Sequence, residues 1–430
     1  MNFRRNPEID QGFFLKTYFT LKRLSCRYFT HYRENMLDSI SFKNLPQGPE
    51  AYLRQLGWNW ALGEDTFYIS NELIEISEQL GDQYAQATND LYDMCCEALE
   101  HCIQHERWDD LEIPKNLREV IRYTWNTDHH LHMYSRFDLA GGIGKSPIKL
   151  LEFNADTPTC LPETAIVQWA QMKQNNLDES RQFNFVYEAI KENFIRLMDL
   201  NPDKNPAMLF TAIEGFAEDD TNLSVLMEAA KEVGFEVDFA YVQDIDFAAN
   251  EGVFLTKPDG NTYAYPYLFK LIPWEEIGLE EPELADLLSK LIMQEKVMVL
   301  NPPYTLVFQS KALLKYLWDL YPYHPLLLET DLKPLKGKKQ VEKVNFGREG
   351  ANIRIIEADG QISKIEHGPY QDFKKIYQAY TPLAEDRFGQ TYQAGVFFAY
   401  EACGLGFRKG GKIINDGAQF YGNIISAKKP

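Results

Sequence analysis

The chain has 430 residues, which is enough for two or three domains or for one large composite fold. Its hydrophobic content of 45% and aromatic content of 13% indicate an ordered globular protein and exclude a largely disordered chain. A net charge of −19 argues against nucleic acid or an anionic membrane as the main partner, and it is compatible with a cationic substrate.

Six cysteines occur without a CxxC pair or the paired Cys/His spacing of a zinc site, which is typical of reduced thiols in a cytosolic protein. We therefore expect a cytoplasmic location. No apolar run of 18 residues occurs, so the sequence predicts neither export nor a membrane span. Residues 1–45 fit no clean helix or strand pattern, and no role is predicted for them. The cysteines are Cys26, Cys95, Cys96, Cys102, Cys160 and Cys403.

Two helices are predicted in the first third of the chain. From Ser70 to about Gln104 apolar residues recur at steps of three and four, which predicts one long amphipathic helix. A second helix is expected within residues 110–130, with Pro114 near its start.

The next stretch predicts a β-hairpin. YSRFDLAGGIGKSPIK (134–149) runs into LLEFNADTPTC (150–160), and polar residues occupy every second position of both segments. Alternate side chains of a strand share a face, and the glycines at 141, 142 and 144 are typical of a turn between antiparallel strands. The hairpin gathers four polar side chains into one patch if the register places them on the same side: Arg136, Asp138, Glu152 and Asn154.

This patch suggests a particular chemistry. Carboxylate and amide oxygens are ligands of Mg²⁺, which is usually shared with phosphates, and a neighbouring arginine suggests an anion that gains charge during a reaction. The alternative is a polar hairpin edge that faces solvent.

A change of pattern follows the hairpin and a further predicted helix over Thr164 to Gln174. A strand at 208–213, a helix from Thr221 to Val233 and a strand at 235–242 form a β-α-β unit, which predicts a parallel sheet with a right-handed crossover. The acidic run 218–220 precedes that helix, where the dipole favours carboxylates, and a capping role alone is an alternative.

Two lysines in the last third carry candidate chemistry. Lys343 ends a strand in 338–357 and is followed by a loop with two glycines, a composition that lets backbone N–H groups and cations approach phosphates. A simple hairpin with a flexible tip is the alternative. Lys311 follows Ser310, a predicted N-cap, in the first turn of a helix; such a lysine is normally solvated, so an anion nearby would explain it.

Strands are also predicted at 375–383, 392–409 and 412–420. Nucleophilic catalysis finds little support, because no GxSxG elbow occurs. His130 and His132 lack a third zinc ligand of suitable spacing.

The order of these motifs resembles one known family. Over roughly residues 50–425 the chain contains, in this order, R-x-D, E-x-N-A-D-T-P-T, K-A-L-L and K-x-x-x-x-R-x-G-x-N. This series of motifs resembles that of the glutathionylspermidine synthetase family of ATP-grasp ligases, without the amidase domain of its bifunctional members. The resemblance implies a composite α+β and α/β fold: an ATP-grasp fold with a helical N-terminal part and a small β-α-β, pre-ATP-grasp-like subdomain.

This reading divides the chain into four parts. They are an extension of unknown role (1–45), a helical part with the metal-binding hairpin (46–200), a β-α-β substrate subdomain (201–300) and an ATP-grasp nucleotide-binding part (301–430).

The resemblance also implies roles for individual residues. Arg136 is the catalytic arginine that steadies the transferred phosphoryl group, and Asp138, Glu152 and Asn154 hold Mg²⁺, as two ions. The implied ATP-binding residues, besides Arg136, are Lys311, Lys343, Arg348, Glu349, Gly350, Gln378, Ala379, Tyr380, Thr381, Ile413, Ile414 and Asn415. The implied substrate residues are Thr157, Thr159, Asp219, Asp220, Glu275 and Arg408.

Departures from the family pattern lie on the substrate side, where Asp219–Asp220 replace a Glu–Glu pair and Glu276 replaces a threonine. The resemblance thus implies an ATP- and Mg²⁺-dependent ligase that joins a peptide-like carboxylate to an amine through an acyl phosphate. A phosphotransferase and a non-catalytic nucleotide-binding protein on the same scaffold are the alternatives. The oligomeric state is not predicted.

Overall fold

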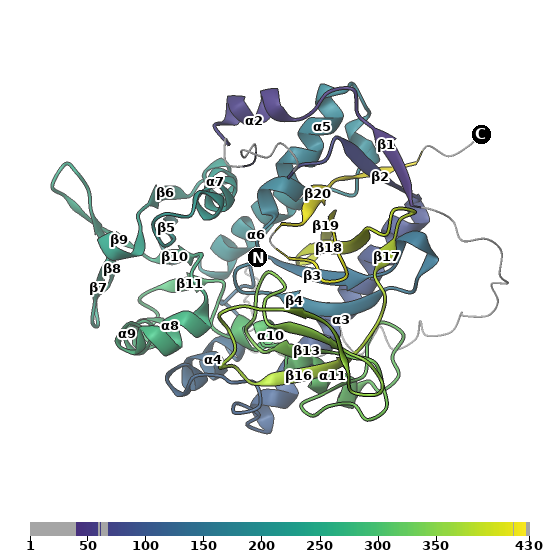
Figure 1. The fold of residues 1–430 in the computed structure, drawn as a ribbon. Helices are drawn as coiled ribbons and strands as arrows, with labels where there is room; N and C mark the ends of the chain where they lie inside the picture. Colours follow the sequence, from purple (N-terminus) through teal and green to yellow (C-terminus); the bar gives the residue numbers. More distant parts are fainter. Residues whose placement is uncertain (1–39, 59–60, 62–67, 416, 427–430) are drawn as a thin grey trace, which may run out of the picture. The chain divides into compact units, whose positions relative to one another are not determined.

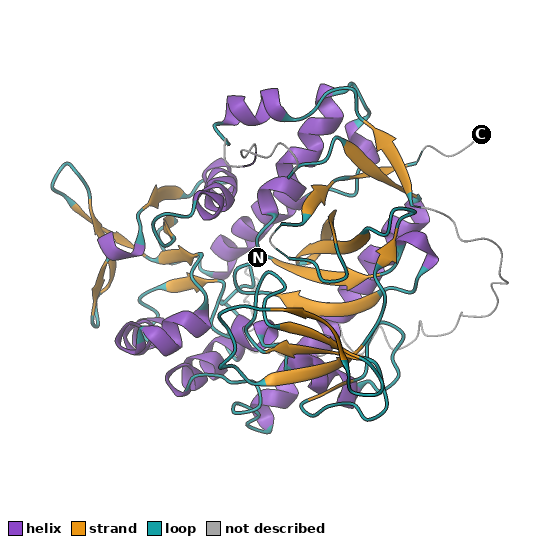
Figure 2. Cartoon of the chain, viewed as in Figure 1, coloured by secondary structure: helices purple, strands orange, loops and turns teal. Residues whose placement is uncertain are grey.

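The computed structural model describes residues 40–58, 61, 68–415 and 417–426 (Figure 1). Residues 1–39, with Cys26 and most of the predicted extension, lie outside this part. Helices and strands alternate through the described chain (Figure 2), so the mixed α/β character predicted from the sequence is confirmed. None of the described helices is both long and apolar enough to cross a membrane.

The largest sheet joins the predicted hairpin to strands from the end of the chain. Its order is β20-β19-β18-β3-β4, all antiparallel, with β17 paired to β18. These strands are β3 (Ser135–Ala140), β4 (Lys149–Asn154), β17 (Ala384–Glu385), β18 (Thr391–Ala399), β19 (Glu401–Gly410) and β20 (Gln419–Tyr421).

The predicted hairpin register is confirmed. Asp138 lies opposite Glu152 and Arg136 opposite Asn154, so the four polar side chains share one face. On the other face Phe137 stacks on Phe153 with ring centroids 3.9 Å apart. Both rings are buried, and burial of a phenylalanine side chain contributes about 1.5–3 kcal/mol, which is enough to select this register over a one-residue slip.

A second antiparallel sheet carries the lysine-containing strand of the last third. Its order is β12-β16-β13-β14-β15, and the predicted pair of strands around a glycine-containing loop is confirmed as β13 and β14. The strands are β12 (Thr330–Asp331), β13 (Gln340–Val344), β14 (Ile353–Ile356), β15 (Ile362–Glu366) and β16 (Lys375–Ala379).

The β-α-β unit is also confirmed, because β5 and β6 pair in parallel around helix α7. The parallel sheet has the order β11-β10-β5-β6, and a small antiparallel sheet, β7-β8-β9, continues from it. Their elements are β5 (Ala207–Thr211), α7 (Ala217–Glu232), β6 (Glu236–Phe239), β7 (Asp246–Ala248), β8 (Gly252–Thr256), β9 (Thr262–Tyr265), β10 (Tyr267–Lys270) and β11 (Met298–Leu300).

Helix α3 (Glu78–Gln104) packs against β18 and β19 and holds the hairpin turn. Its Tyr84 hydroxyl donates to the carbonyl of Gly141 at 2.6 Å and accepts from the amide of Ile143. Gly142 has φ +82°, and a Cβ there would lie 2.2 Å from the Tyr84 oxygen, so glycine is required at this turn.

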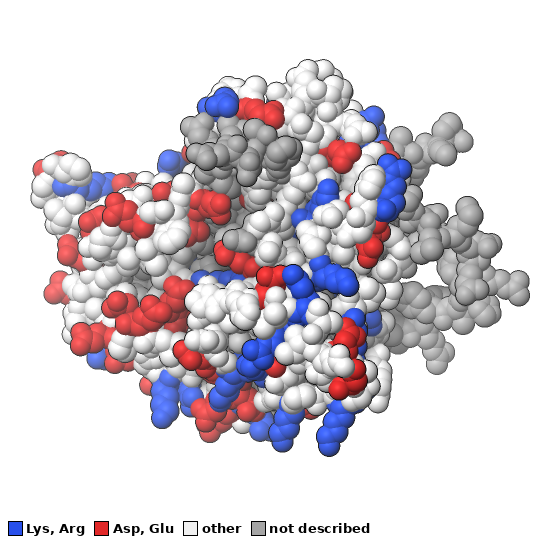
Figure 3. Space-filling model, viewed as in Figure 1, with Lys and Arg blue, Asp and Glu red and all other residues white. Residues whose placement is uncertain are grey.

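The remaining helices and the edge sheet β1-β2-β21 surround these sheets. Acidic side chains gather over α8 and α9 on the face shown in Figure 3, and lysine and arginine side chains over the β12–β16 sheet. The elements are β1 (Ser41–Asn44), α2 (Glu50–Leu56), β2 (Glu72–Ile76), α4 (Arg118–Trp125), α5 (Gln168–Gln174), α6 (Val186–Leu200), α8 (Trp274–Glu280), α9 (Pro282–Met293), α10 (Thr305–Gln309), α11 (Leu313–Leu320) and β21 (Asn423–Ile425).

Two predictions about helices were wrong in part. The helix predicted from Ser70 begins only at Glu78, because residues 72–76 form β2 between β1 and β21, and the Ser77 side chain caps the helix. The β-α-β helix α7 begins before Thr221, so the acidic run lies inside its first turn.

Two predictions in the last third also need correction. Ser310 is not an N-cap: its hydroxyl donates to the carbonyl of Leu111, and α11 begins three residues later. Lys311 is buried in the short connection between α10 and α11. Of the strand predicted at 412–420 only Gln419 and Phe420 are in a strand, β20, and residues 412–415 form a loop.

Candidate active site

A cleft of about 780 Å³ is lined by side chains of the large sheet, the β12–β16 sheet and the β-α-β region. It brings together residues that are up to 278 positions apart, from Arg136 to Ile414. The predicted residues that line it are Arg136, Asp138, Glu152, Asn154, Thr157, Thr159, Asp219, Lys343, Arg348, Glu349, Gly350, Gln378, Ala379, Tyr380, Thr381, Arg408, Ile413 and Ile414.

Four predicted residues do not line the cleft. Lys311 lines a small pocket beside it, together with Glu152 and Lys343. Asp220 accepts a hydrogen bond from the Tyr241 hydroxyl, and Glu275 is buried against Arg348. Asn415 contributes its backbone carbonyl, which accepts from Arg408 at 2.6 Å.

The Arg136 guanidinium organises one side of the hairpin patch. Its Nε donates to Asp138 Oδ1 at 2.7 Å, its Nη2 to Oδ2 at 3.1 Å and its Nη1 to the carbonyl of Thr159 at 2.6 Å. Burial raises the pKa of Asp138 although Arg136 opposes this effect. Burial opposes the charged form of Arg136, but its anionic neighbours, Asp138 foremost and then Glu152, together raise the pKa of Arg136.

Glu152 lies between two lysines. Its Oε2 is 3.2 Å from Lys311 Nζ, and its Oε1 accepts from the Asn154 amide at 3.3 Å. Burial opposes ionisation of Glu152, yet Lys311 and Lys343 hold its pKa at about 2. Burial lowers the pKa of Lys343 to about 8, against the pull of Glu152.

The donor atoms of the hairpin patch are of the kind that binds a magnesium ion jointly with phosphates. Among the described residues no group of three or more His, Cys, Asp and Glu side chains forms a metal cage. Two carboxylates in opposed register with an adjacent amide are instead a partial ligand set, and Mg²⁺ is usually held by one or two carboxylates and completed by phosphates and water.

The loop between β13 and β14, residues 345–352, closes one side of the cleft. Arg348 pairs with Glu275 and Glu276 at the start of α8, and Lys311 Nζ donates to the carbonyl of Gly347 at 2.6 Å. Gly350 has φ +71°, and a Cβ there would lie 2.3 Å from the carbonyl oxygen of Ile414. The loop therefore touches α8, Lys311 and the 413–414 segment together.

The opposite wall carries the predicted strand of the nucleotide site. Gln378 is buried, its Oε1 accepts from Lys343 at 2.9 Å and its Nε2 donates to the carbonyl of Leu150. Sequence reasoning missed the apolar part of this wall, which contains Leu328, Val341 and Ile355. Val341 and Ile355 are directly paired across β13 and β14, so strand alternation is the signal that locates them.

The part of the cleft predicted to bind substrate combines hydroxyl, cationic and acidic groups. Thr157 and Thr159 follow β4, and Arg408 lies opposite Gln393 across β18 and β19. Gln393 was not predicted, although it lines the cleft and donates to Asp138 Oδ2 at 2.9 Å. Burial, with help from Glu218 and Asp220, raises the pKa of Asp219 to about 6.

Fold and site together define a mixed α/β protein whose cleft presents buried cations, paired carboxylates and a glycine-containing loop. Residues 41–426 match the family described as glutathionylspermidine synthase preATP-grasp, so the chain belongs to that family. This confirms the resemblance found in the motifs and the enzyme class that it implies, a carbon–nitrogen ligase.

The relatives include proteins named for amide-forming reactions. The chain is 28% identical over 355 residues to a putative acid–amine ligase of Haemophilus influenzae, a match that covers 80% of this chain and 86% of the relative. It is 24% identical to the bifunctional glutathionylspermidine synthetase/amidase of Escherichia coli, over 70% of this chain and 51% of that protein. It is 23% identical to trypanothione synthetase of Crithidia fasciculata, over 75% and 52%. The match thus spans about half the length of the latter two.

One solved structure shares the fold. A glutathione synthetase-like effector of Globodera pallida, in its apo form, superposes with a TM-score of 0.54 at 9% identity, covering 89% of this chain and 100% of that one.

Proposed function

We propose that the chain is an ATP- and Mg²⁺-dependent ligase with an ATP-grasp nucleotide site, which joins a carboxylate to an amine through an acyl phosphate. The observation that carries this proposal is the pairing of Asp138 with Glu152 beside Arg136, Lys311 and Lys343. These charges meet in the cleft and in the small pocket beside it, and the proposed reaction builds up negative charge on a transferred phosphoryl group.

The nucleotide is assigned to the space between the large sheet that contains the hairpin and the β12–β16 sheet. Lys311 and Lys343 would neutralise phosphates, and the 345–352 loop would present backbone N–H groups to them. The apolar wall of Leu328, Val341 and Ile355 suits an adenine ring, next to Gln378, Ala379, Tyr380 and Thr381. Ile413 and Ile414 line the same cleft where the loop touches them.

Asp138, Glu152 and Asn154 would hold magnesium, as two ions. Bound Mg²⁺ supplies positive charge that offsets the charge of the phosphate oxygens. Arg136 is already fixed by Asp138 and by the carbonyl of Thr159, so its guanidinium needs no reorganisation to stabilise charge that develops in transfer.

The acid substrate is assigned to Thr157, Thr159 and Arg408, and the amine to the acidic side of the cleft at Asp219. Glu275 contributes indirectly, because it is buried against Arg348. Asp220 supports Asp219 from the same helical turn and contacts Tyr241.

The proposed chemistry proceeds in two steps. A carboxylate oxygen attacks the terminal phosphorus of ATP, and ADP leaves. The amine nitrogen then attacks the acyl carbon, the carbon–oxygen bond to phosphate breaks, inorganic phosphate leaves and the nitrogen loses a proton. The closed loop would exclude water, which otherwise hydrolyses the acyl phosphate.

The first experiment incubates purified protein with Mg²⁺-ATP and glutathione, with and without spermidine, the substrates that the relatives' names suggest. ADP and phosphate release are followed, and products are weighed by mass spectrometry. Amine-dependent turnover with a conjugate mass supports the ligase. A stable phosphorylated acid with no amide would favour a phosphotransferase.

If Mg²⁺-ATP binds and no turnover occurs, the same assay is repeated with a panel of carboxylates and primary amines. Absence of turnover with every pair, together with unimpaired nucleotide binding, would contradict the ligase and favour a nucleotide-binding protein.

A further inference from the structure

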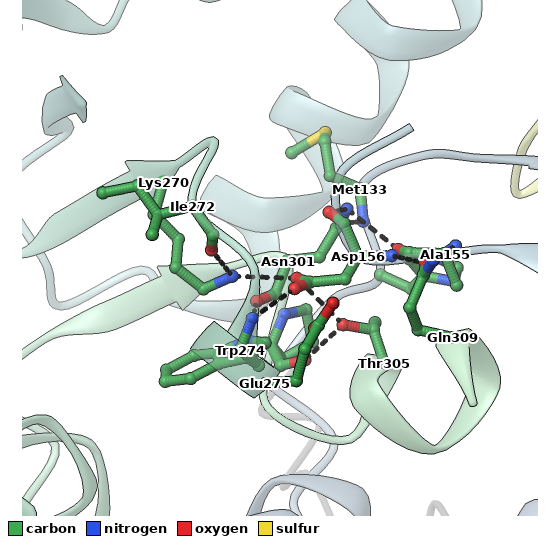
Figure 4. A network of polar contacts seen from close by, with 12 residues as sticks. Met133, Ala155, Asp156, Lys270, Ile272, Trp274, Glu275, Asn301, Thr305 and Gln309 are labelled. Carbon is green, nitrogen blue, oxygen red and sulfur yellow. Dashed lines mark hydrogen bonds and ion pairs between the residues drawn. The ribbon is translucent and has the colours of Figure 1, made fainter. Parts of the chain in front are cut away.

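A buried charge pair that does not line the cleft lies just after the hairpin (Figure 4). Lys270 Nζ is 2.8 Å from Asp156 Oδ1, and the two side chains are 2% and 0% exposed. Asp156 Oδ2 accepts from the backbone amide of Trp274 at 2.8 Å, and Lys270 also donates to the carbonyl of Ile272. The pair therefore joins a residue two positions after β4 to the end of β10 and the start of α8.

Further polar contacts fix the same backbone. The Asn301 amide nitrogen donates to the carbonyls of Tyr134, Ala155 and Asp156, at 3.2, 3.1 and 2.8 Å. Gln309 Oε1 accepts from the amide of Ala155 at 2.9 Å. Ala155 and Asp156 are thus held by groups from α8, α10 and the segment after β11 (Figure 4).

Stability alone is a weak reason for a buried ion pair. Well-packed apolar residues of similar volume are often as stabilising or more so, because desolvation offsets most of the attraction between the charges. The pair instead fixes the relative orientation of two segments, because the two oxygens of Asp156 accept separately from the Lys270 ammonium and from the Trp274 backbone amide.

The two segments that the pair joins both lead directly into the cleft. One residue after Asp156 comes Thr157, which lines the cleft, and the carbonyl of Thr159 accepts from Arg136. One residue after Trp274 comes Glu275, which pairs with Arg348 of the 345–352 loop. Glu276 Oε1 lies 3.0 Å from Arg348 Nη1.

We infer that Asp156 and Lys270 are positioning residues that hold the acid-binding segment 157–159 and the α8 anchor of the 345–352 loop in one geometry. Placement of the acid and closure of the loop are thereby linked. This inference rests on the proposed function for its catalytic consequence, whereas the link between the two segments is a structural claim of its own.

The test replaces both charges, in Asp156→Asn/Lys270→Met, and measures amide hydrogen exchange across the full-length protein. The matched control is Asp238→Asn/Lys257→Met, which removes an ion pair of the same 2.8 Å distance outside the cleft lining. All proteins are compared at the same interval below their own melting temperatures.

We expect exchange in residues 345–352 to rise about tenfold or more, and protection of this loop by Mg²⁺-ATP to weaken, with helix α3 unchanged. In the ligase assay kcat should fall about tenfold or more, and the KM for the acid should rise. The control should change neither quantity.

Loop exchange within twofold of wild type, or a uniform rise in every segment, would overturn the inference. If the double variant does not fold, Asp156→Asn alone is used, since Asn keeps an acceptor for the Trp274 amide and burial lowers the pKa of Lys270. If no substrate pair is ever found, the exchange result with Mg²⁺-ATP still decides the structural claim, so the two failures remain distinct.

Discussion

Asp138 and Glu152 face each other across the hairpin, but different cations hold them. Asp138 accepts from Arg136 and from Gln393, whereas Glu152 is paired with Lys311. Both carboxylates are therefore part of one cluster of paired charges. Removing a side chain completely would leave cations without partners, so isosteric amides are the cleaner probes.

Glu152→Gln or Asp138→Asn should lower nucleotide turnover at least about 100-fold, because the ligand charge for Mg²⁺ is lost while the shape is kept. Turnover is measured as ADP release at saturating Mg²⁺, with circular dichroism as the check of the fold. Glu401→Gln, at an exposed position of β19, is the control. Normal turnover in either amide variant would refute the metal assignment.

Arg136→Ala should lower kcat far more than it weakens ATP binding, because its proposed role is to stabilise charge in the transfer step. Binding of Mg²⁺-ATP is measured by calorimetry and turnover by phosphate release. A defect confined to ATP binding would argue against this role.

The proposed contact of Asp219 with the amine would make that step sensitive to pH. Burial and its acidic neighbours raise the pKa of Asp219 to about 6, so its charge is lost as pH falls through that value. We expect kcat/KM for a cationic amine to fall about tenfold per pH unit below pH 6. Asp219→Asn should give a lower, flatter profile, whereas Asp220→Asn should keep the wild-type shape but move it to lower pH, because Asp220 helps to raise the pKa of Asp219.

Stability gives an independent readout of the same group. A carboxyl whose pKa is raised on folding opposes folding when it is ionised, so Asp219→Asn should raise the melting temperature at pH 7. The gain should shrink as pH falls from about 6 towards 3.8, the ordinary value for aspartate. An unchanged melting temperature at pH 7 would mean that folding does not raise the pKa of Asp219.

At the residue scale, prediction succeeded where the signal was local. Alternation and the glycine turn predict that Arg136, Asp138 and Glu152 share a face, and the register confirms it. Local spacing carries no information about Glu275 and Arg348, which are 73 residues apart, or about Lys270 and Asp156, 114 apart. Those pairs form only after separate elements pack.

At the element scale, the 345–352 loop depends on a close backbone approach. Gly350 combines φ +71° with a backbone contact that leaves no room for a Cβ, whereas Gly360 has φ +89° and nothing within 4 Å. Substituting each glycine in turn therefore distinguishes the effect of the left-handed backbone, which both share, from the effect of the contact with Ile414, which only Gly350 makes.

Gly350→Ala should lower turnover about tenfold or more, because the loop has to leave the 413–414 segment. Both Gly350→Ala and Gly360→Ala should cost about 1 kcal/mol or more of stability through the left-handed backbone. Melting temperatures and ADP release are measured in parallel. Equal activity in the two variants would show that the contact with Ile414 is not needed.

Element boundaries were harder to predict than element types for a related reason. Residues 72–76 satisfy the helical period, but Leu73, Ile74 and Ile76 are buried in a strand that pairs with β1 and β21. Pairing partners from the end of the chain decide this conformation, and a local period cannot detect them.

At the scale of the whole described unit, the site is assembled from both halves of the chain. β3 pairs with β18, which places Asp138 opposite Gly395 and Arg136 opposite Phe397. The division at residues 200 and 300 stays a prediction about function, because the hairpin proposed to bind metal in one part completes its sheet with strands of another.

This topology predicts that the hairpin does not form in a fragment that stops at residue 300. Without β18 the edge of β3 is unpaired and Phe137 loses the cover of Phe398, whose ring centroid is 6.4 Å away. Hydrogen exchange of residues 135–154 should then approach that of an unfolded chain, and Mg²⁺ should not slow it. Co-expression of residues 301–430 should restore protection, because the missing strands return. Protection of the hairpin in the isolated fragment would show that the first half folds independently and that the cleft is assembled by docking of preformed parts.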